Sequence, residues 1–294
     1  MNDEAAHPPG TGKLWGESWY FDFADPGCAW GGYLRVGSYP NLQTGWLWLV
    51  LVGDELGDAG PVRIVEHRLA PPRQYGQELV VAGPAGDCLL RCHTSYEHWS
   101  ARARAPGVSL DLNWHAAAPE YRYEQASRYE QPCDVAGEIT VRGRTVAISA
   151  PGQRDHSWGV RDWWRIPWLW FAGRLNDGTR AHATQLVVRR PFPAYGYVDS
   201  ADGRRDLVSE CQVSAGPGPD RTPPRRTGLS LGQLDLGLTS RWPANVLLDG
   251  PDGQAGTLFR SLCAVETADG RAGSGWLEWN MPGTVPRRAG LTTM

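Results

Sequence analysis

Glycine and proline interrupt this chain so often that long helices are excluded. The 294 residues include 36 glycines and 23 prolines, and the runs between them are short and rich in Val, Leu, Ile, Thr, Tyr and Trp. Such runs are typical of antiparallel strands. Turn residues at 142–144, 176–178 and 201–203 predict hairpins, and the best helix candidate, residues 230–238, is short. The sequence therefore predicts an all-β fold with few short helices.

A polar segment at residues 116–130 divides the chain into two sets of predicted hairpins. Each set has the size that closes into a lipocalin-like barrel. We therefore expect two β domains of that size, formed by residues 1–125 and 126–294. Both chain ends, residues 1–12 and 285–294, are mostly polar and are expected to lie loose on the surface.

Composition and charge exclude several classes of function. The formal net charge of −3 argues against a nucleic-acid partner, because binding phosphates requires a basic face. The longest strongly apolar run, residues 46–52, is far too short to span a bilayer, so no membrane span is predicted. The first residues lack the basic and apolar regions of a secretory signal. We therefore expect a cytoplasmic protein whose cysteines are reduced and buried.

No cofactor or metal site is predicted from the motifs. The chain has neither a GxGxxG that opens a helix after a strand nor a P-loop. Cys88 and Cys92 have no matching second pair for zinc. His93 and His98 would face opposite sides of a regular strand, so they could share a metal only across a bulge.

The densest mixture of charge and indole lies at residues 152–171, GQRDHSWGVRDWWRIPWLWF. This combination is typical of an apolar pocket that contains a few proton-handling groups. The alternative is a buried polar hairpin that only stabilises the fold. Asp155 and His156 are the candidate catalytic residues, although neighbours on a regular strand point to opposite faces. Gly152 and Gly159 favour an irregularity that would bring both into one site.

Asp155 has two alternative roles. Near Arg154 and Arg161 it could be a permanently ionised partner in ion pairs. Among Trp158 and Trp163 its pKa could instead be raised by burial, which would make it a general acid. The indoles could stabilise a cation formed on a substrate, or they could simply fill the core.

Two further clusters alternate carboxylates with aromatic residues. In the segment ESWYFD, Glu17 shares a strand face with Trp19, whereas Tyr20 faces the other side. We expect Glu17 to pair with an arginine from residues 154–165. In the segment WLEW, Glu278 could line a cavity in the C-terminal half or lie at its rim.

Three segments together resemble a known superfamily. The segment QRDHSWGVRDW is similar to the D-H-x-W-G signature of carotenoid 1,2-hydratases, AttH-like proteins and kievitone-hydratase-like proteins. The opening ESWYFDF and the ending GSGWLEW resemble the start and the close of their two halves.

The resemblance implies two consecutive lipocalin-like (calycin) β-barrels, with the central motif at their junction. It also implies that Asp155 donates a proton to an alkene, that His156 orients it or manages water, and that Trp158 faces the cationic carbon. Arg154, beside Asp155, is a departure from several relatives and is expected to lower the pKa of that carboxyl.

The resulting hypothesis is a cofactor-free acid–base enzyme whose partner is a small hydrophobic substrate. It would hydrate, dehydrate or cyclise an alkene of isoprenoid or polyketide type. The alternatives are a pericyclic cyclase that works by shaping its substrate and a non-catalytic carrier of hydrophobic ligands. The expected substrate-binding residues are Trp158, Arg161, Trp163, Tyr20, Glu17, Trp170 and Glu278.

Overall fold

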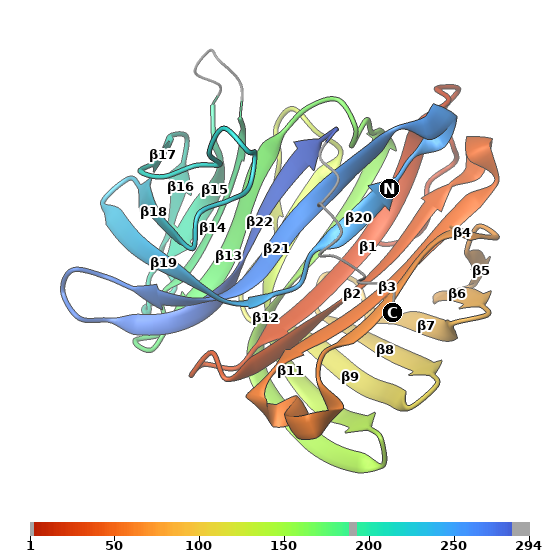
Figure 1. Cartoon of the computed structure of the whole chain (residues 1–294), viewed down its shortest axis with the longest axis horizontal. Helices are drawn as coiled ribbons and strands as arrows, with labels where there is room; N and C mark the ends of the chain where they lie inside the picture. Colours follow the sequence, from red (N-terminus) through yellow and green to blue (C-terminus); the bar gives the residue numbers. More distant parts are fainter. Residues whose placement is uncertain (1–2, 188–192, 284–294) are drawn as a thin grey trace, which may run out of the picture.

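The computed structural model describes residues 3–187 and 193–283. Their strands form two antiparallel sheets (Figure 1). This confirms the predicted all-β class. The helices in the described residues are short 3-10 turns: η1 (Pro40–Leu42), η2 (Asp54–Ala59) and η3 (Pro251–Gly253). None of the described helices has the length and hydropathy needed to cross a membrane.

The first sheet has the strand order β4-β3-β2-β1-β12-β11-β9-β8-β7-β6-β5, with β10 paired to β11. Its strands are β1 (Trp15–Ala24), β2 (Trp30–Tyr39), β3 (Thr44–Gly53), β4 (Val62–Leu69), β5 (Arg73–Tyr75), β6 (Glu78–Gly83), β7 (Gly86–Thr94), β8 (His98–Ala105), β9 (Val108–Ala116), β10 (Tyr121–Arg122), β11 (Arg128–Val141) and β12 (Arg144–Val160).

The second sheet has the order β16-β15-β14-β13-β22-β21-β19-β18-β17, with β20 paired to β21. Its strands are β13 (Trp168–Leu175), β14 (Arg180–Leu186), β15 (Tyr195–Asp199), β16 (Arg205–Val208), β17 (Cys211–Val213), β18 (Arg226–Leu231), β19 (Leu234–Pro243), β20 (Val246–Asp249), β21 (Ala255–Glu266) and β22 (Ala272–Pro282).

The two sheets repeat one topology. In each, the first strand pairs with the last, β1 with β12 and β13 with β22, and the two edge strands follow each other in the chain. Each sheet is therefore a meander that turns back on itself, and together they form a half-barrel and a nearly closed barrel, as expected for two lipocalin-like barrels. We call them the first and the second barrel.

The change of sheet differs from the expected boundary at residues 125 and 126. Strands β11 and β12, including the central motif, pair within the first sheet, and the second sheet begins at Trp168. The polar residues 116–130 do not link the two sheets. They connect β9 to β11 within the first sheet and include the short strand β10, which pairs with β11. The link between the barrels is instead residues 161–167.

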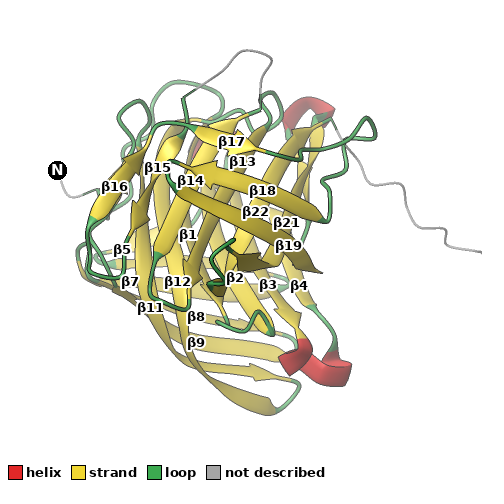
Figure 2. Cartoon of the chain, turned by 90° about the vertical axis from the view of Figure 1, so that its left-hand side faces the viewer, coloured by secondary structure: helices red, strands yellow, loops and turns green. Residues whose placement is uncertain are grey.

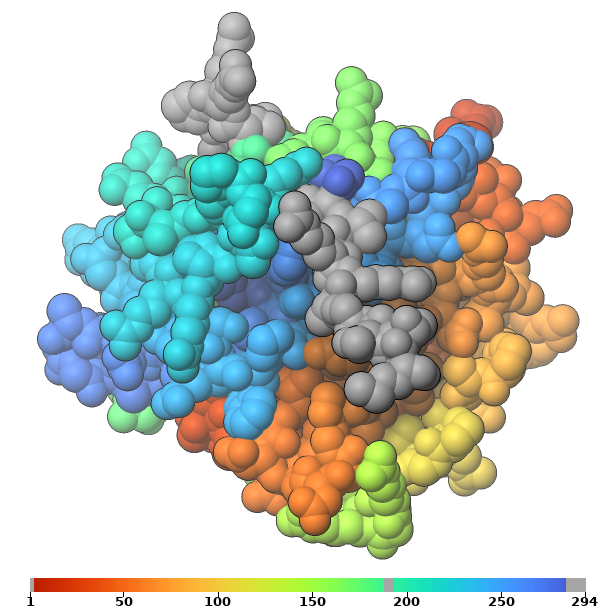
Figure 3. Space-filling model, viewed as in Figure 1, coloured from red at the N-terminus to blue at the C-terminus, as the bar shows by residue number. Residues whose placement is uncertain are grey.

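Three buried cores follow from this arrangement. One fills the first barrel, one fills the second, and the third lies between them, where Tyr20, Trp48 and Trp163 pack against Trp170 and Trp276. Figure 2 views the molecule from the side of the second sheet, with β1 and β12 behind it. In Figure 3 the two barrels abut directly on the face shown. We call the layer between them the junction.

Strand β1 is buried on both faces because it lies between the first core and the junction. Trp19 and Phe21 belong to the core of the first barrel, whereas Tyr20 and Ala24 belong to the junction core. This alternation confirms the faces predicted for the segment ESWYFD. Neighbouring residues of β12 also face opposite sides. His156 pairs with Trp19 and faces the first barrel, whereas Asp155 pairs with Tyr20 and faces the junction.

Other local predictions have mixed outcomes. The hairpins predicted at residues 142–144, 176–178 and 201–203 join β11 to β12, β13 to β14 and β15 to β16. The helix predicted for residues 230–238 is wrong, because these residues form the hairpin between β18 and β19. All six cysteines are buried and free, as expected. The expectation of a loose N-terminal end is wrong for residues 3–12, because Glu4 is buried and His7 contacts Glu17. Residues 285–294 lie outside the described residues.

Gly152 allows β12 to approach β1 closely, which gives a first prediction. A Cβ atom there would lie 2.1 Å from the Asp22 carbonyl oxygen and 2.6 Å from Val135 Cγ2. We expect Gly152→Ala to lower the free energy of unfolding by about 1–3 kcal/mol, since backbone must move. Gly237→Ala is the control, because the nearest atom would be 3.6 Å away. Equal denaturation midpoints for the two variants would contradict this packing.

Candidate functional site

A cavity of about 330 Å³ opens at the junction, where the link between the barrels crosses the strand ends. Its walls come from both sheets. Part of the lining is charged or phenolic, and part is apolar or indole. The lining residues are Arg35, Tyr123, Gln125, Ala126, Arg128, Val160, Arg161, Asp162, Trp163, Ile166, Trp168, Thr184, Leu186, Tyr195 and Glu278.

Two other hollows have comparable volumes, about 400 and 430 Å³. Their walls include exposed segments, residues 222–225 in one and residues 249–253 in the other. The junction cavity is the candidate site because its walls come from both sheets and combine buried Arg35 and Glu278 with the indoles of Trp163 and Trp168, the usual composition of a small-molecule site.

Arginines form the charged side of the cavity. Arg35 projects from β2 into the junction and is only 3% exposed. Its guanidinium carbon lies 4.9 Å from the ring centre of Tyr20 and 5.1 Å from that of Trp163. Its Nε has no hydrogen-bond partner among the described residues. Arg35 is thus a buried cation that is partly stabilised by aromatic faces.

Arg161 begins the link between the barrels and also borders the cavity. Its Nη1 donates to the Ser157 hydroxyl and lies 3.3 Å from Ser18 Oγ. Within the described ranges it forms no ion pair with a carboxylate. Burial and the nearby charge of Arg128 lower the pKa of Arg161 to about 10. Arg161 therefore adds to the cavity lining a cation that has no direct carboxylate partner among the described residues.

Asp155 is the main counterion of this cluster. It lies beneath the cavity, with Oδ2 3.0 Å from Arg128 Nη2 and 3.6 Å from Arg35 Nη2. Burial opposes its ionisation, but Arg128, Arg35 and further guanidinium groups outweigh burial and hold its pKa below the usual range. Asp155 is therefore a permanently ionised partner in ion pairs, one of the two roles expected from the sequence.

A chain of polar contacts connects the cavity to the interior of the junction. Glu278 Oε1 accepts a hydrogen bond from the Trp168 indole at 2.9 Å, and its Oε2 lies 2.5 Å from Arg260 Nη1. Arg260 also donates to the Tyr20 hydroxyl, which donates to Asp22 Oδ2 at 2.5 Å. Burial raises the pKa of Asp22 to about 7, although Arg260 and Tyr20 oppose this.

Glu130 is a second buried carboxyl group with an unusual pKa. It accepts hydrogen bonds from Arg128 Nε at 2.8 Å and from Gln153 Nε2 and Trp170 Nε1 at 3.0 Å each. Burial raises its pKa to about 7 against the effect of Arg128, and the charge of Asp155 adds to the rise. Near neutral pH, the junction therefore contains carboxyl groups in both protonation states.

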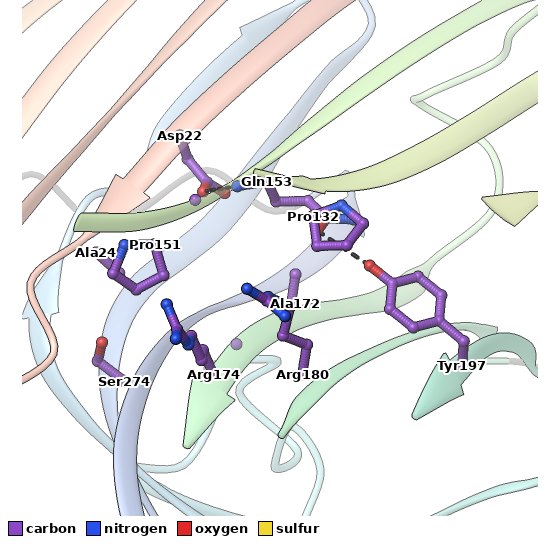
Figure 4. Close-up of a pocket in the computed structure, with 13 residues that line it drawn as sticks. Asp22, Ala24, Pro132, Pro151, Gln153, Ala172, Arg174, Arg180, Tyr197 and Ser274 are labelled. Atoms are coloured by element: carbon purple, nitrogen blue, oxygen red, sulfur yellow. Dashed lines mark hydrogen bonds between the residues drawn. The ribbon is translucent and has the colours of Figure 1, made fainter. Parts of the chain in front are cut away.

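The polar contacts extend to a small pocket of about 20 Å³ beside Asp22 (Figure 4). There the Tyr197 hydroxyl donates to Gln153 Oε1 at 3.1 Å, and the Gln153 backbone N–H donates to Asp22 Oδ1 at 2.8 Å. The volume suits one water molecule. This pocket extends the hydrogen-bond network and is too small for a substrate.

His182 adds a neutral group behind the cavity wall. Burial and the charge of Arg128 lower its pKa to about 3. Its Nδ1 donates to the Phe171 carbonyl oxygen at 2.8 Å, so its Nε2 can accept the hydrogen bond of the Tyr123 hydroxyl at 2.8 Å. Tyr123 is thereby held at the cavity edge.

The structure brings only some of the expected site residues together. Arg161, Trp163 and Glu278 line the cavity. Asp155, Tyr20 and Trp170 lie just beneath it, in contact with its arginines or with Glu130. The remaining expected residues, Glu17, His156 and Trp158, lie on the opposite face of β1 and β12.

Asp155 and His156 do not share a site. The pairing of β1 with β12 is regular through both residues, so they point to opposite faces and the expected irregularity is absent from this part of the described structure. His156 stacks on Trp19 and contacts Glu17, which therefore pairs with histidine and not with an arginine. Arg154 also points away from Asp155 and binds Glu4 in the first barrel.

Sequence reasoning missed the residues that give the cavity its charge. Arg35 and Arg128 come from distant segments and meet Asp155 only because β2 and β11 flank β1 and β12. Arg35 carried a weak signal, since it is a charged residue in the run GGYLRVGSY, which otherwise contains no charged residue. Arg128 carried none, because it lies at the end of a polar segment that looked like a linker.

Comparisons with known proteins place the chain in a wider group. A family model described as "Domain of unknown function (DUF7064)" matches residues 1–283. No curated protein sequence matches the chain. An AttH protein structure from Nitrosomonas europaea is 15% identical, with 95% of each chain covered and a TM-score of 0.65.

Two further solved structures are similar. CghA in complex with Sch210972 is 11% identical, with 94% of each chain covered and a TM-score of 0.69. Kievitone hydratase from Nectria haematococca is 12% identical, with 92% of this chain and 90% of that chain covered and a TM-score of 0.62. These likenesses confirm the superfamily resemblance at the level of the fold.

The role of Asp155 as a counterion predicts a large loss of stability in Asp155→Asn. Removing this charge leaves Arg35 and Arg128 buried without their shared partner. We expect the free energy of unfolding to fall by about 3–5 kcal/mol in urea denaturation. The control is Asp111→Asn, which removes an exposed pair with Arg102 and should cost less than about 1 kcal/mol. Similar losses for both variants would contradict the assignment.

The raised pKa of Asp22 predicts a specific pH dependence. Asp22 is protonated in the folded protein below about pH 7, whereas it ionises near its ordinary value when unfolded. Its stabilising contribution is full below that ordinary pKa and is lost as the pH rises towards 7. Between these limits the wild-type free energy of unfolding should fall more steeply than that of Asp22→Asn, by about 1.4 kcal/mol per pH unit. Parallel curves from urea titrations across this range would refute it.

Proposed function

Since the chain belongs to the DUF7064 family, we propose that it is a non-redox enzyme that binds an unsaturated, hydrophobic small molecule in the junction cavity. The proposed reaction is the addition or removal of water, with ring closure as the alternative. The observation that carries the proposal is the arginine cluster of Arg35, Arg128 and Arg161 beside indole walls. The likeness in fold to kievitone hydratase supports this reaction class.

The charge of the cavity favours a substrate with an acidic or carbonyl oxygen. Guanidinium groups recognise such oxygens through charge-assisted hydrogen bonds. Arg35 lines the cavity, and Arg161 lacks an ion pair among the described residues, so their guanidinium groups can serve a ligand. Trp163 and Trp168 provide flat apolar surface for the unsaturated part of the molecule.

The same charge favours a reaction in which negative charge develops on the substrate. In a hydration, Glu278 would take a proton from water while the water oxygen bonds to an alkene carbon conjugated with the carbonyl group. The alkene electron pair would move towards the carbonyl oxygen, which the arginines would stabilise. The proton on Glu278 would then pass to the other alkene carbon. The reverse sequence removes water.

A cationic intermediate fits this environment less well. Three guanidinium groups at the cavity would repel a positive charge, even with indoles nearby. Asp155 also has a lowered pKa and lies beneath the lining, which weakens it as a proton donor. Glu278 therefore replaces Asp155 as the proposed proton-transfer residue.

Ring closure is the second candidate reaction. It needs a shaped apolar surface and polarisation of a carbonyl group, and it needs no proton transfer. The aromatic part of the cavity lining and the arginines supply these features, and the fold is similar to that of CghA in complex with Sch210972. A carrier without activity would use the same surfaces, so turnover has to be measured.

The arginine cluster predicts a preference for anionic ligands. Anilinonaphthalene sulfonate and the neutral phenylnaphthylamine are a suitable pair of fluorescent apolar probes. Arg161→Gln should weaken binding of the sulfonate at least about tenfold, because a charge-assisted hydrogen bond is lost, and should change the neutral probe little. Arg102→Gln is the control, because the Arg102 side chain is exposed on β8 of the first barrel. Equal weakening of both probes would argue against an anion-binding role.

The proposed role of Glu278 predicts that Glu278→Gln loses turnover. Conjugated, apolar unsaturated carbonyl compounds incubated in heavy water would be followed by mass spectrometry. Hydration adds one water and one carbon-bound deuterium, whereas ring closure leaves the mass unchanged. We expect water addition to slow about 10²- to 10⁴-fold in the variant while the sulfonate probe still binds. Probe binding by the wild type without turnover of any compound would favour the carrier.

A further inference from the structure

A second group of convergent side chains lies on the opposite face of β1 and β12, within the first barrel. It consists of His7, Glu17 and His156, one ligand atom of each being within 4.8 Å of the others. Glu17 Oε1 lies 2.7 Å from His7 Nδ1 and 2.8 Å from His156 Nε2. Glu17 and His156 are buried, whereas the His7 side chain is 15% exposed.

The protons of His156 show why these contacts need an explanation. His156 Nδ1 lies 2.6 Å from the Asp3 carbonyl oxygen, which can only accept a hydrogen bond. Nδ1 therefore carries the proton, and in a neutral ring Nε2 presents a lone pair. That lone pair points at Glu17 Oε1, so a carboxylate oxygen and a lone pair face each other at 2.8 Å. Such a contact needs a positive charge between them or on the ring.

His7 contacts the same carboxylate oxygen. Its Nδ1 faces Glu17 Oε1, and its Nε2 lies 3.6 Å from Asp3 Oδ1. Asp3 orients the outer nitrogen of His156 through its carbonyl group, whereas its carboxylate lies beyond hydrogen-bond distance of His7. The outer contact of His156, a ring N–H directed at a carbonyl oxygen, is usual for histidines that bind metals.

Indoles hold both rings in place. Trp158 stacks on His7 with ring centres 4.0 Å apart, and Trp19 stacks on His156 at 4.7 Å. Packing therefore fixes the direction of both inner nitrogens, and the Asp3 carbonyl group also fixes that of His156. This ordering distinguishes the group from a surface cluster of mobile side chains.

We propose that His7 Nδ1, Glu17 Oε1 and His156 Nε2 bind one divalent transition-metal ion, such as Zn²⁺. Two imidazoles and a carboxylate are a ligand set typical of such ions. With metal–ligand distances of about 2.0–2.2 Å, Glu17 Oε1 would retreat from each nitrogen by about half an ångström. The partial exposure of His7 leaves room for water as a fourth ligand.

The ion would fix the N-terminal segment on the first barrel. Glu4 already extends into that barrel, where it accepts hydrogen bonds from Trp99, Tyr129 and Arg154. His7 is the only proposed ligand outside β1 and β12, so the ion would tie this segment to the two central strands. Binding would thereby stabilise the folded state.

The test uses the full chain after removal of metal with a chelator. Zn²⁺ binding would be measured by calorimetry and by the shift in Tm, and Co²⁺ would serve as a spectroscopic probe. We expect near-stoichiometric Zn²⁺ binding, a rise in Tm of about 5 °C and visible Co²⁺ bands of a four-coordinate site. His7→Ala should lose all three responses while keeping the β-sheet circular dichroism.

A second variant controls for adventitious binding. His93, His98 and His115 stack on the outside of the first barrel, with ring centres 4.3 and 4.2 Å apart, and could bind Zn²⁺ weakly. The double variant His93→Ala/His115→Ala should keep the three responses. If it loses them, or if His7→Ala keeps them, the proposed site is wrong.

The wild-type protein alone can also overturn the proposal. Absence of Zn²⁺ binding, together with nitrogen NMR shifts that show both His156 nitrogens protonated, would mean that the group is an imidazolium–carboxylate pair. A folding defect in His7→Ala would not obscure this result.

Discussion

The ion pairs of Asp155 with Arg35 and Arg128 are the constraint on which the junction depends. Three guanidinium groups lie between two sheets, where water cannot solvate them fully, and a single carboxylate with a lowered pKa is shared by two of them. A buried cation without a counterion would cost several kcal/mol. Asp155 therefore makes the arginine cluster possible, and the cluster gives the cavity its chemistry.

Strand β12 separates two environments because its side chains alternate. Asp155 faces the junction with its arginines, while Arg154 and His156 face the interior of the first barrel, where they meet Glu4 and Glu17. One short motif thus supplies groups to two unrelated sites. This explains how a dense run of charged and aromatic residues can be buried on both sides of a central strand.

Local pattern predicted much of the fold, and tertiary pairing explains what it missed. The alternation in ESWYFD correctly assigned Glu17 and Tyr20 to opposite faces, and turn residues located several hairpins. The glycines around Asp155 and His156 suggested an irregularity, but β12 has partners on both sides that keep it regular. The arginines of the cavity became neighbours only through sheet topology, which no local pattern encodes.

The most direct measurement is a crystal structure of the protein with a bound apolar, unsaturated acid. The arginine cluster at the junction predicts that the carboxylate lies within hydrogen-bond distance of Arg161 and Arg35, with the apolar part against Trp163 and Trp168. A ligand seated inside either barrel, or one whose carboxylate points away from these arginines, would contradict the account.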